Sequence, residues 1–335
     1  MVSLAEGDIR DLLSGADDEL LFKRAAEIRE QVFGKDVYLR AVIEFSNYCN
    51  KKCQYCGLRA PNREAVRYRM PRETMMDAAE AAALGEVGTI VLQSGDDFKY
   101  SREFIGDLVR EIKEKYDLAV TLSLGDRKLE EYKYWRECGA DRCLVKLETT
   151  DRDLYDRFRM GESFEERLQR VENLRDFGYE VGSGVIVGLP GMTIETTAKD
   201  IEFLSTLDLD MIAAGPFIPH PQTPLADCEI GDIPLSHRVT ALLRVLNPPA
   251  NIPATSALSA LDSVSQGQAL QRGCNVLMPS MTPEEHRSDY SIYPGKNKTH
   301  ATASASLESA KSMVRSLGFV PSKEHGFSKR KTHVE

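Results

Sequence analysis

Short runs of apolar residues recur along the chain and alternate with stretches of helical periodicity. Eight such runs lie near 38–46, 88–94, 118–124, 141–147, 181–188, 211–215, 251–257 and 274–280. Between two of them, Ile105, Leu108 and Ile112 recur on one helical face, with charged residues opposite. Strands that are apolar along their whole length predict a parallel sheet covered by helices. Eight strand-like runs with helices between them favour a closed (β/α)8 barrel over an open doubly wound sheet.

The two ends of the chain extend this barrel. Residues 1–35 have the periodicity of helices, with Leu21, Ala25 and Ile28 on one face. The barrel is expected over 36–320, including a last helix near 303–317, and 321–335 is expected to be a loosely ordered, lysine-rich tail. The predicted fold is therefore a TIM-type α/β barrel with N-terminal helices and a C-terminal helical extension. In such a barrel, functional residues lie in the loops that follow the strands.

Composition narrows the class of protein. The 335 residues include 43 Lys+Arg and 52 Asp+Glu, for a net charge of −9, with 42% hydrophobic residues. This balance is typical of a soluble globular protein and argues against nucleic-acid binding, which favours a basic surface. No apolar run approaches the roughly 20 residues that a membrane span needs. The first residues carry acids where a signal peptide needs bases, so a cytoplasmic location is expected, and the seven cysteines are expected to be reduced.

Three of these cysteines follow the first predicted strand at close spacing. Cys49, Cys53 and Cys56 form C-x3-C-x2-C within one loop. A structural zinc ion would need a fourth ligand, and a redox pair would leave Cys49 unexplained. Three thiolates suit an iron–sulfur cluster with one open iron, which implies an exogenous ligand. Tyr55 is placed to pack on a flat ligand near the cluster. Isolated cysteines expected to be structural are Cys138, Cys143, Cys228 and Cys274.

This spacing resembles that of the radical S-adenosylmethionine (SAM) superfamily. Further strings, such as IEFSNYCNKKCQYCGLR, TIVLQSGDD, GPFIPHPQTPLA, NIPAT and YPGK, resemble the family of the [FeFe]-hydrogenase maturase HydE, to which biotin synthase and methylornithine synthase are more distantly related. The resemblance implies one [4Fe–4S] cluster and SAM as cofactors, with SAM cleaved reductively to a 5′-deoxyadenosyl radical. It also implies reduced ferredoxin or flavodoxin as electron donor, and other hydrogenase maturases as partners. The implied substrate is a small cysteine-bearing organometallic iron species, modified at sulfur inside the barrel.

The resemblance also assigns ligand contacts to particular positions. Arg167 would meet the SAM carboxylate, because a guanidinium fork suits that group. Glu148 would hold the amino or ribose groups of SAM, unless it forms an ordinary ion pair with Arg167. Further implied SAM contacts are Gln93, Gly95, Asp96, Thr121, Met211 and Tyr293. Implied substrate contacts are Arg142, Thr255 and Ser256. Met211 is alternatively core filling, and Arg142 alternatively pairs with a carboxylate at the start of its strand.

Two departures from the family pattern bear on function. No cysteine follows Cys274, so a second cluster is not expected. Lys146-Leu147 stands where the family carries Arg-His, which leaves the substrate open. An alternative is therefore a HydE-like paralogue that acts on another small amino-acid-like substrate, as a methylornithine-synthase-like mutase does. A non-catalytic iron–sulfur carrier is a further alternative, and it would need an exposed cluster.

Overall fold

A parallel sheet forms the centre of the molecule. The computed structural model describes residues 6–297 and 302–330. Its strands lie in the order β6-β5-β4-β3-β2-β1-β7, and β8 pairs with β1. The strands are β1 (Asp36–Ser46), β2 (Thr89–Ser94), β3 (Ala119–Ser123), β4 (Arg142–Leu144), β5 (Glu180–Val187), β6 (Met211–Pro216), β7 (Val276–Leu277) and β8 (Val320–Ser322).

Residues 251–254 close this sheet into a ring. The backbone N–H of Ile212 in β6 donates to the carbonyl of Asn251, and the N–H of Ala254 donates to the carbonyl of Val276 in β7. These residues form isolated bridges rather than a regular strand. Pro253 lies among them, and proline has no N–H to donate to a ladder. Every predicted strand run therefore takes part in the sheet, and the predicted α/β barrel is confirmed.

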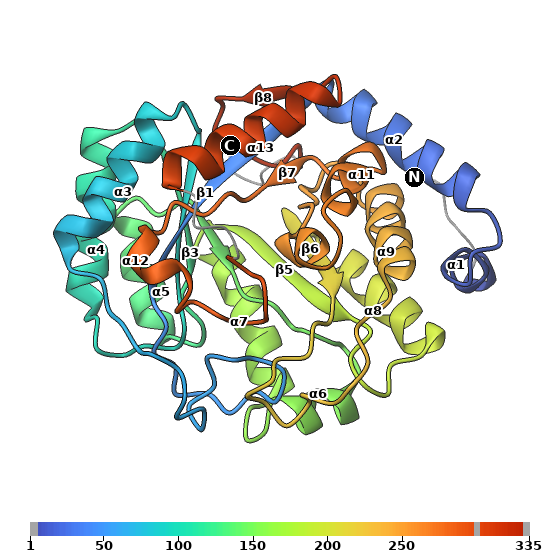
Figure 1. The fold of residues 1–335 in the computed structure, drawn as a ribbon, viewed down its shortest axis with the longest axis horizontal. Helices are drawn as coiled ribbons and strands as arrows, with labels where there is room; N and C mark the ends of the chain where they lie inside the picture. Colours follow the sequence, from blue (N-terminus) through green and yellow to red (C-terminus); the bar gives the residue numbers. More distant parts are fainter. Residues whose placement is uncertain (1–5, 298–301, 331–335) are drawn as a thin grey trace.

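Helices surround the sheet on its outside (Figure 1). Several begin at a side-chain cap; for example, the hydroxyl of Ser101 accepts from the N–H of Phe104 at the start of α4. The helices are α1 (Glu6–Leu13), α2 (Asp18–Phe33), α3 (Arg72–Leu84), α4 (Arg102–Lys115), α5 (Leu129–Glu137), α6 (Arg152–Phe158), α7 (Phe164–Asp176), α8 (Ile194–Thr206), α9 (Ile233–Leu246), α10 (Ser256–Leu261), α11 (Ser265–Gln271), α12 (Glu284–Arg287) and α13 (Ala303–Ser316). No helix of residues 6–297 and 302–330 is long and apolar enough to cross a membrane.

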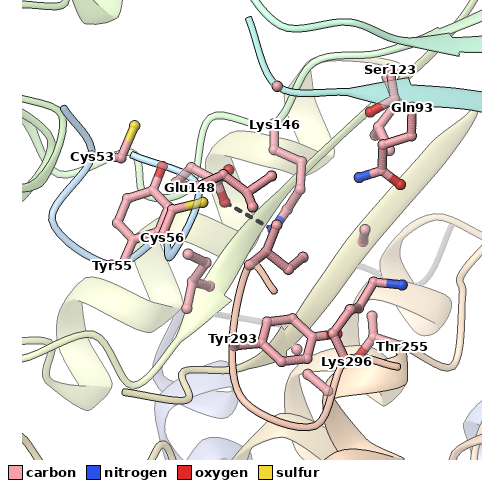
Figure 2. A pocket seen from close by; sticks show the side chains of 18 of the residues that line it. Cys53, Tyr55, Cys56, Gln93, Ser123, Lys146, Glu148, Thr255, Tyr293 and Lys296 are labelled. Atoms are coloured by element: carbon pink, nitrogen blue, oxygen red, sulfur yellow. Dashed lines mark ion pairs between the residues drawn. The ribbon is translucent and has the colours of Figure 1, made fainter. Parts of the chain in front are cut away.

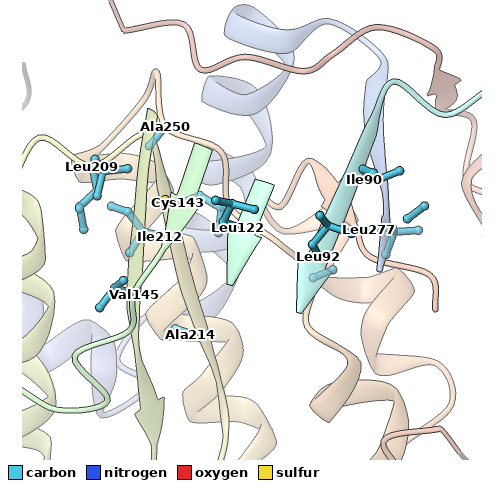
Figure 3. Packing of buried hydrophobic residues seen from close by; sticks show 14 of the residues in the cluster. Ile90, Leu92, Leu122, Cys143, Val145, Leu209, Ile212, Ala214, Ala250 and Leu277 are labelled. Atoms are coloured by element: carbon cyan, nitrogen blue, oxygen red, sulfur yellow. The ribbon is translucent and has the colours of Figure 1, made fainter. Parts of the chain in front are cut away.

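The main hydrophobic core lies between the strands and these helices. Strand residues such as Ile90, Leu122 and Ile212 are fully buried in it (Figure 3). On β1, Ile43 belongs to this outer core, whereas Val42, the preceding residue, lines a cavity inside the barrel. This alternation follows from the two-residue period of a strand. The inside of the barrel is therefore left free for ligands.

The C-terminal segment closes the end of the barrel where the strands begin. The carbonyl of His325 accepts from Arg142, and the carbonyl of Gly326 accepts from Arg40 and Asn251. The expectation of a loosely ordered tail is therefore wrong for residues up to 330, while 331–335 lie outside the described residues. The physical reason is that buried guanidinium and amide donors at the strand starts need acceptors, which the carbonyls of the tail provide.

Candidate active site

The barrel contains a cavity of about 330 Å³ that is partly open to solvent. Its wall combines the cysteine loop after β1, the ends of β2 to β6, and residues 290–296. Most residues predicted for the site line it: Cys49, Cys53, Tyr55, Cys56, Gln93, Gly95, Asp96, Glu148, Arg167, Met211, Thr255, Ser256 and Tyr293. Figure 2 shows Cys53, Cys56 and Tyr55 on one side of this space, with Gln93, Thr255 and Lys296 on the other. This cavity is the candidate active site.

The cysteine loop is held by polar side chains and by a close backbone approach. Asn47 donates to the carbonyls of Val66 and Asp289, at 2.6 and 2.7 Å. A Cβ atom added at Gly95 would lie 2.3 Å from the carbonyl oxygen of Tyr48 and 2.8 Å from Cβ of Cys49. Only glycine allows β2 to approach the loop this closely. The position of the three cysteines is therefore fixed by their surroundings.

The three thiols are free and poorly solvated. Burial, followed by the nearby Asp96 carboxylate, raises the pKa of Cys49 to about 11. Burial likewise raises the pKa of Cys53 and of Cys56. Iron would favour the thiolates that this environment otherwise disfavours, since metal ligation requires the deprotonated form. In the described part of the chain, no three potential ligands converge on a single metal ion. Three soft thiols of one loop, each able to bind a separate iron, fit a [4Fe–4S] cluster better than zinc.

Arg159, which directly follows α6, places a positive charge beside the cysteine loop. Its Nη1 lies 3.6 Å from Sγ of Cys53 and 3.2 Å from the hydroxyl oxygen of Tyr55, and both accept from it. Its Nη2 lies 3.2 Å from Oδ2 of Asp126. A buried guanidinium here favours a negatively charged thiolate. Sequence reasoning missed Arg159, because nothing in its helix marks this contact.

Asp126, in the loop after β3, collects several cations. Its Oδ1 lies 2.6 Å from Nη1 of Arg167 and 2.9 Å from Nη1 of Arg170, and its Oδ2 lies 3.3 Å from Nζ of Lys51. Burial alone would raise the pKa of Asp126, but Arg167, Arg159 and the other cations outweigh it and hold the pKa well below its usual value. Asp126 was also missed, although it ends the string VTLSLGD. It positions Arg167 rather than lining the cavity itself.

Glu148 is one of two carboxylates that line the cavity. Its Oε2 lies 2.8 Å from Nζ of Lys146 (Figure 2). Burial would raise the pKa of Glu148, but Lys146 lowers it further, so the carboxylate is ionised. Glu148 has a φ of 70°, in the left-handed region that residues other than glycine rarely adopt. Lys146 lines the cavity, and its neighbour Leu147 is fully buried in the outer core.

Hydroxyl groups gather on the side of the cavity that faces away from the cysteines. The side-chain oxygens of Ser256 and Tyr293 lie 2.7 Å apart. Among the residues that the structure describes, Oγ1 of Thr255 is buried without a hydrogen-bond partner. A Cβ atom at Gly215 would lie 2.5 Å from this oxygen, so Gly215 leaves the room that Thr255 occupies. This oxygen has almost no accessible surface of its own, so a rotation of the Thr255 side chain would be needed to bring it to a ligand in the cavity.

Two predicted contacts lie elsewhere, which corrects the sequence interpretation. Arg142 is at the start of β4, where its Nε lies 2.6 Å from Oε2 of Glu180 and its Nη2 donates to the carbonyl of His325. Thr121 lies beside Arg142 where β3 pairs with β4, and it lines the same small pocket as Arg142. Neither residue lines the main cavity. The alternative that Arg142 pairs with a carboxylate at a strand start describes its observed position.

Comparisons with known proteins agree with this geometry. The family model of the Radical SAM superfamily matches residues 43–204. The chain is 45% identical to the [FeFe] hydrogenase maturase subunit HydE of Thermotoga maritima, over 93% of this chain and 90% of that protein. It is 30% identical to 3-methylornithine synthase of Methanosarcina acetivorans, over 86% and 83% of the two chains. The crystal structure of methylornithine synthase (PylB) superposes with a TM-score of 0.84 at 26% identity, covering 96% and 95%.

A barrel with three cysteines at the mouth of an internal cavity defines a radical SAM enzyme. The chain belongs to the radical SAM superfamily and, within it, to the family of the hydrogenase maturase subunit HydE.

Proposed function

We propose that this enzyme cleaves SAM reductively and directs the radical at a small sulfur-bearing substrate during maturation of a hydrogenase cofactor. The observation that carries this proposal is the cysteine loop, which lines a cavity inside the barrel that has polar groups on its opposite side. When bound, the cluster and SAM supply a 5′-deoxyadenosyl radical, formed with methionine when one electron from reduced ferredoxin or flavodoxin breaks the S–C5′ bond.

Particular side chains would hold these cofactors. Cys49, Cys53 and Cys56 would each bind one iron of the cluster, and the amino and carboxylate groups of SAM would take the fourth. Arg167, held by Asp126, would receive the SAM carboxylate. Glu148 would accept hydrogen bonds from the amino or ribose groups of SAM.

The charge of the cavity suits anionic ligands. Its lining includes the two carboxylates Asp96 and Glu148. The five cations that line it are Lys51, Lys146, Arg159, Arg167 and Lys296. Asp126, Glu162 and Glu44 lie outside this lining and pair with four of the five cations, so the cations rather than these carboxylates face the cavity. A cluster ligated by thiolates, the SAM carboxylate and an anionic substrate would each be stabilised here.

Similarity to HydE supports the sulfur-bearing substrate, which we propose to be a cysteine-bearing organometallic iron species. Other hydrogenase maturases would then provide the substrate and receive the product. Cys53 is only 7% exposed, which disfavours a carrier that must release its cluster. A position inside the barrel also serves radical chemistry, because a reactive radical must meet its target at close range and with little water nearby.

The second candidate is a mutase acting on an amino acid. It is favoured by the TM-score of 0.84 with methylornithine synthase, and by Lys146 in place of the arginine typical of HydE. The substrate would be lysine, the linear isomer of 3-methylornithine.

The two candidates separate in parallel incubations of the reconstituted enzyme with SAM and a reductant. In one, the enzyme replaces HydE in the activation of an [FeFe]-hydrogenase by its remaining maturases. In the other, it receives L-lysine, and 3-methylornithine is sought by mass spectrometry. Hydrogenase activation without formation of 3-methylornithine supports the maturase function. Formation of 3-methylornithine without hydrogenase activation supports the mutase.

A further inference from the structure

Lys296 is a buried cation on the side of the cavity that lies away from the cysteine loop (Figure 2). Its side chain is only 9% exposed, and its Nζ lies 3.0 Å from Oε1 of Glu44. Within residues 6–297 and 302–330, Glu44 is the one acceptor that this ammonium group contacts. An ammonium group has three N–H donors, so two remain for a ligand in the cavity.

Glu44 holds this ammonium group in place through one oxygen, and its other oxygen is already occupied. Its other oxygen, Oε2, accepts from the hydroxyl of Ser280 at 2.7 Å and from the hydroxyl of Thr282. Glu44 is fully buried on β1, a central strand of the barrel. Burial would lower the pKa of Lys296, but Glu44 raises it further, so the side chain stays charged.

Three hydroxyl groups line the same cavity as Lys296. Tyr293 is close enough to Lys296 to raise the pKa of that side chain. The hydroxyl oxygens of Tyr293 and Ser256 lie 2.7 Å apart. Thr255, the residue before Ser256, has the buried hydroxyl that lacks a partner among the described residues. A fixed cation together with hydroxyl donors provides the complement of a carboxylate group.

We propose that Lys296 determines specificity by binding the carboxylate of the substrate, with the hydroxyl of Thr255 as a second donor. This inference deepens the proposed function and rests on it. The carboxylate of SAM is the competing ligand, but that group belongs next to the cluster, whereas Lys296 lies across the cavity from Cys53 and Cys56 (Figure 2). The sequence interpretation gave this role to Arg142, but Arg142 forms an ion pair with Glu180. Lys296 takes the role in its place.

The test compares two small thiols in calorimetry with the reconstituted, SAM-loaded enzyme. L-Cysteine and cysteamine share a thiol and an amine, and only L-cysteine has a carboxylate. We expect the enzyme to bind L-cysteine about tenfold or more tightly than cysteamine, because a charge-assisted hydrogen bond is lost with the carboxylate. Lys296→Met should remove this preference, and Thr255→Val should reduce it. Lys128→Met is the matched control, since Lys128 is exposed, and it should keep the full preference.

The proposal is overturned if the enzyme shows no preference for L-cysteine, or if Lys296→Met retains it. Removal of Lys296 leaves Glu44 buried and unpaired, so the double variant Glu44→Gln/Lys296→Met provides the same test if the single variant does not fold. SAM cleavage without substrate is measured on the same preparations. Failure of the enzyme to cleave SAM contradicts the proposed function, whereas normal cleavage without a carboxylate preference contradicts only the role of Lys296.

Discussion

Arg167 donates from Nη1 to Oδ1 of Asp126 at 2.6 Å, and from Nε to the carbonyl of Lys146 at 2.6 Å. The guanidinium that is expected to meet the SAM carboxylate is therefore fixed on two sides. Its side chain still lines the cavity, so its remaining donors are available to a ligand. A donor held in this way loses little conformational freedom when it binds. Asp126 thus acts through Arg167, as a positioning residue.

Replacement of Asp126 by Asn should destabilise the enzyme strongly. The change leaves Arg159, Arg167 and Arg170 close together and without their shared carboxylate. Removing one partner of a buried ion pair typically costs about 3–5 kcal/mol. Urea unfolding measures the loss, with Asp107→Asn as the exposed control. A variant as stable as the native enzyme would show that the cations do not depend on Asp126.

Replacement of Gly95 by Ala should displace the cysteine loop. The added Cβ atom would overlap the carbonyl of Tyr48, which is backbone and has little room to move. We expect the iron content after reconstitution to fall severalfold while the barrel stays folded. In Gly267→Ala, the new Cβ atom meets only a side-chain carbon of Leu317, at 3.4 Å, so this control should bind iron normally. Full iron content in Gly95→Ala would mean that the loop tolerates displacement.

Much of the fold and part of the site could be predicted from local sequence. The strand runs show as apolar segments, and the C-x3-C-x2-C spacing identifies the cluster ligands because they share one loop. The interpretation was less successful where a residue depends on distant partners. Arg159 and Asp126 are far apart in the chain, and only the folded barrel brings them together. Lys296 belongs to the string YPGK, but its charged contact with Glu44 spans most of the barrel sequence.

The contacts of the C-terminal segment could likewise not be predicted from local sequence. Its composition suggests a solvated tail, yet its backbone carbonyls meet the buried donors of Arg40 and Arg142. Hydrophobic patterning cannot reveal such contacts, because they involve main-chain acceptors that every residue carries. Arg142 is held by such contacts outside the main cavity, so its observed position does not support the predicted substrate contact.

Replacement of Arg142 by Met should therefore affect stability rather than substrate recognition alone. It leaves Glu180 without its guanidinium partner and removes the bond to the carbonyl of His325. We expect a loss of about 3 kcal/mol or more in the free energy of unfolding. Denaturant unfolding measures it, with the exposed Arg102→Met as control. If the variant keeps native stability and selectively loses substrate turnover, Arg142 contacts the substrate.

The free energy of unfolding should depend on pH through the ionisation of Asp200. This buried carboxylate accepts from the N–H and the hydroxyl of Thr150, both at 2.6 Å. Burial raises the pKa of Asp200 from 3.8 to about 6. The folded enzyme therefore binds this proton more tightly than the unfolded chain does. The favourable contribution to stability is complete below about pH 4 and is lost as the pH rises through 6.

Asp200→Asn retains an acceptor for Thr150 and removes this ionisation. Relative to the native enzyme, the variant should be more stable at pH 8 than at pH 4.5, by at most about 3 kcal/mol. Urea unfolding at the two pH values measures the difference, and the exposed Asp153→Asn serves as control. A difference that is the same at both pH values, or of opposite sign, would contradict the assignment.

We expect SAM cleavage to depend on the three cysteines of the loop after β1. Anaerobic incubation of the reconstituted enzyme with SAM and dithionite, followed by chromatography for 5′-deoxyadenosine, measures it directly. We predict about four iron atoms per chain and formation of 5′-deoxyadenosine, with both lost in Cys53→Ser and both retained in Cys228→Ser. Formation of 5′-deoxyadenosine by Cys53→Ser at the native rate would contradict the central claim.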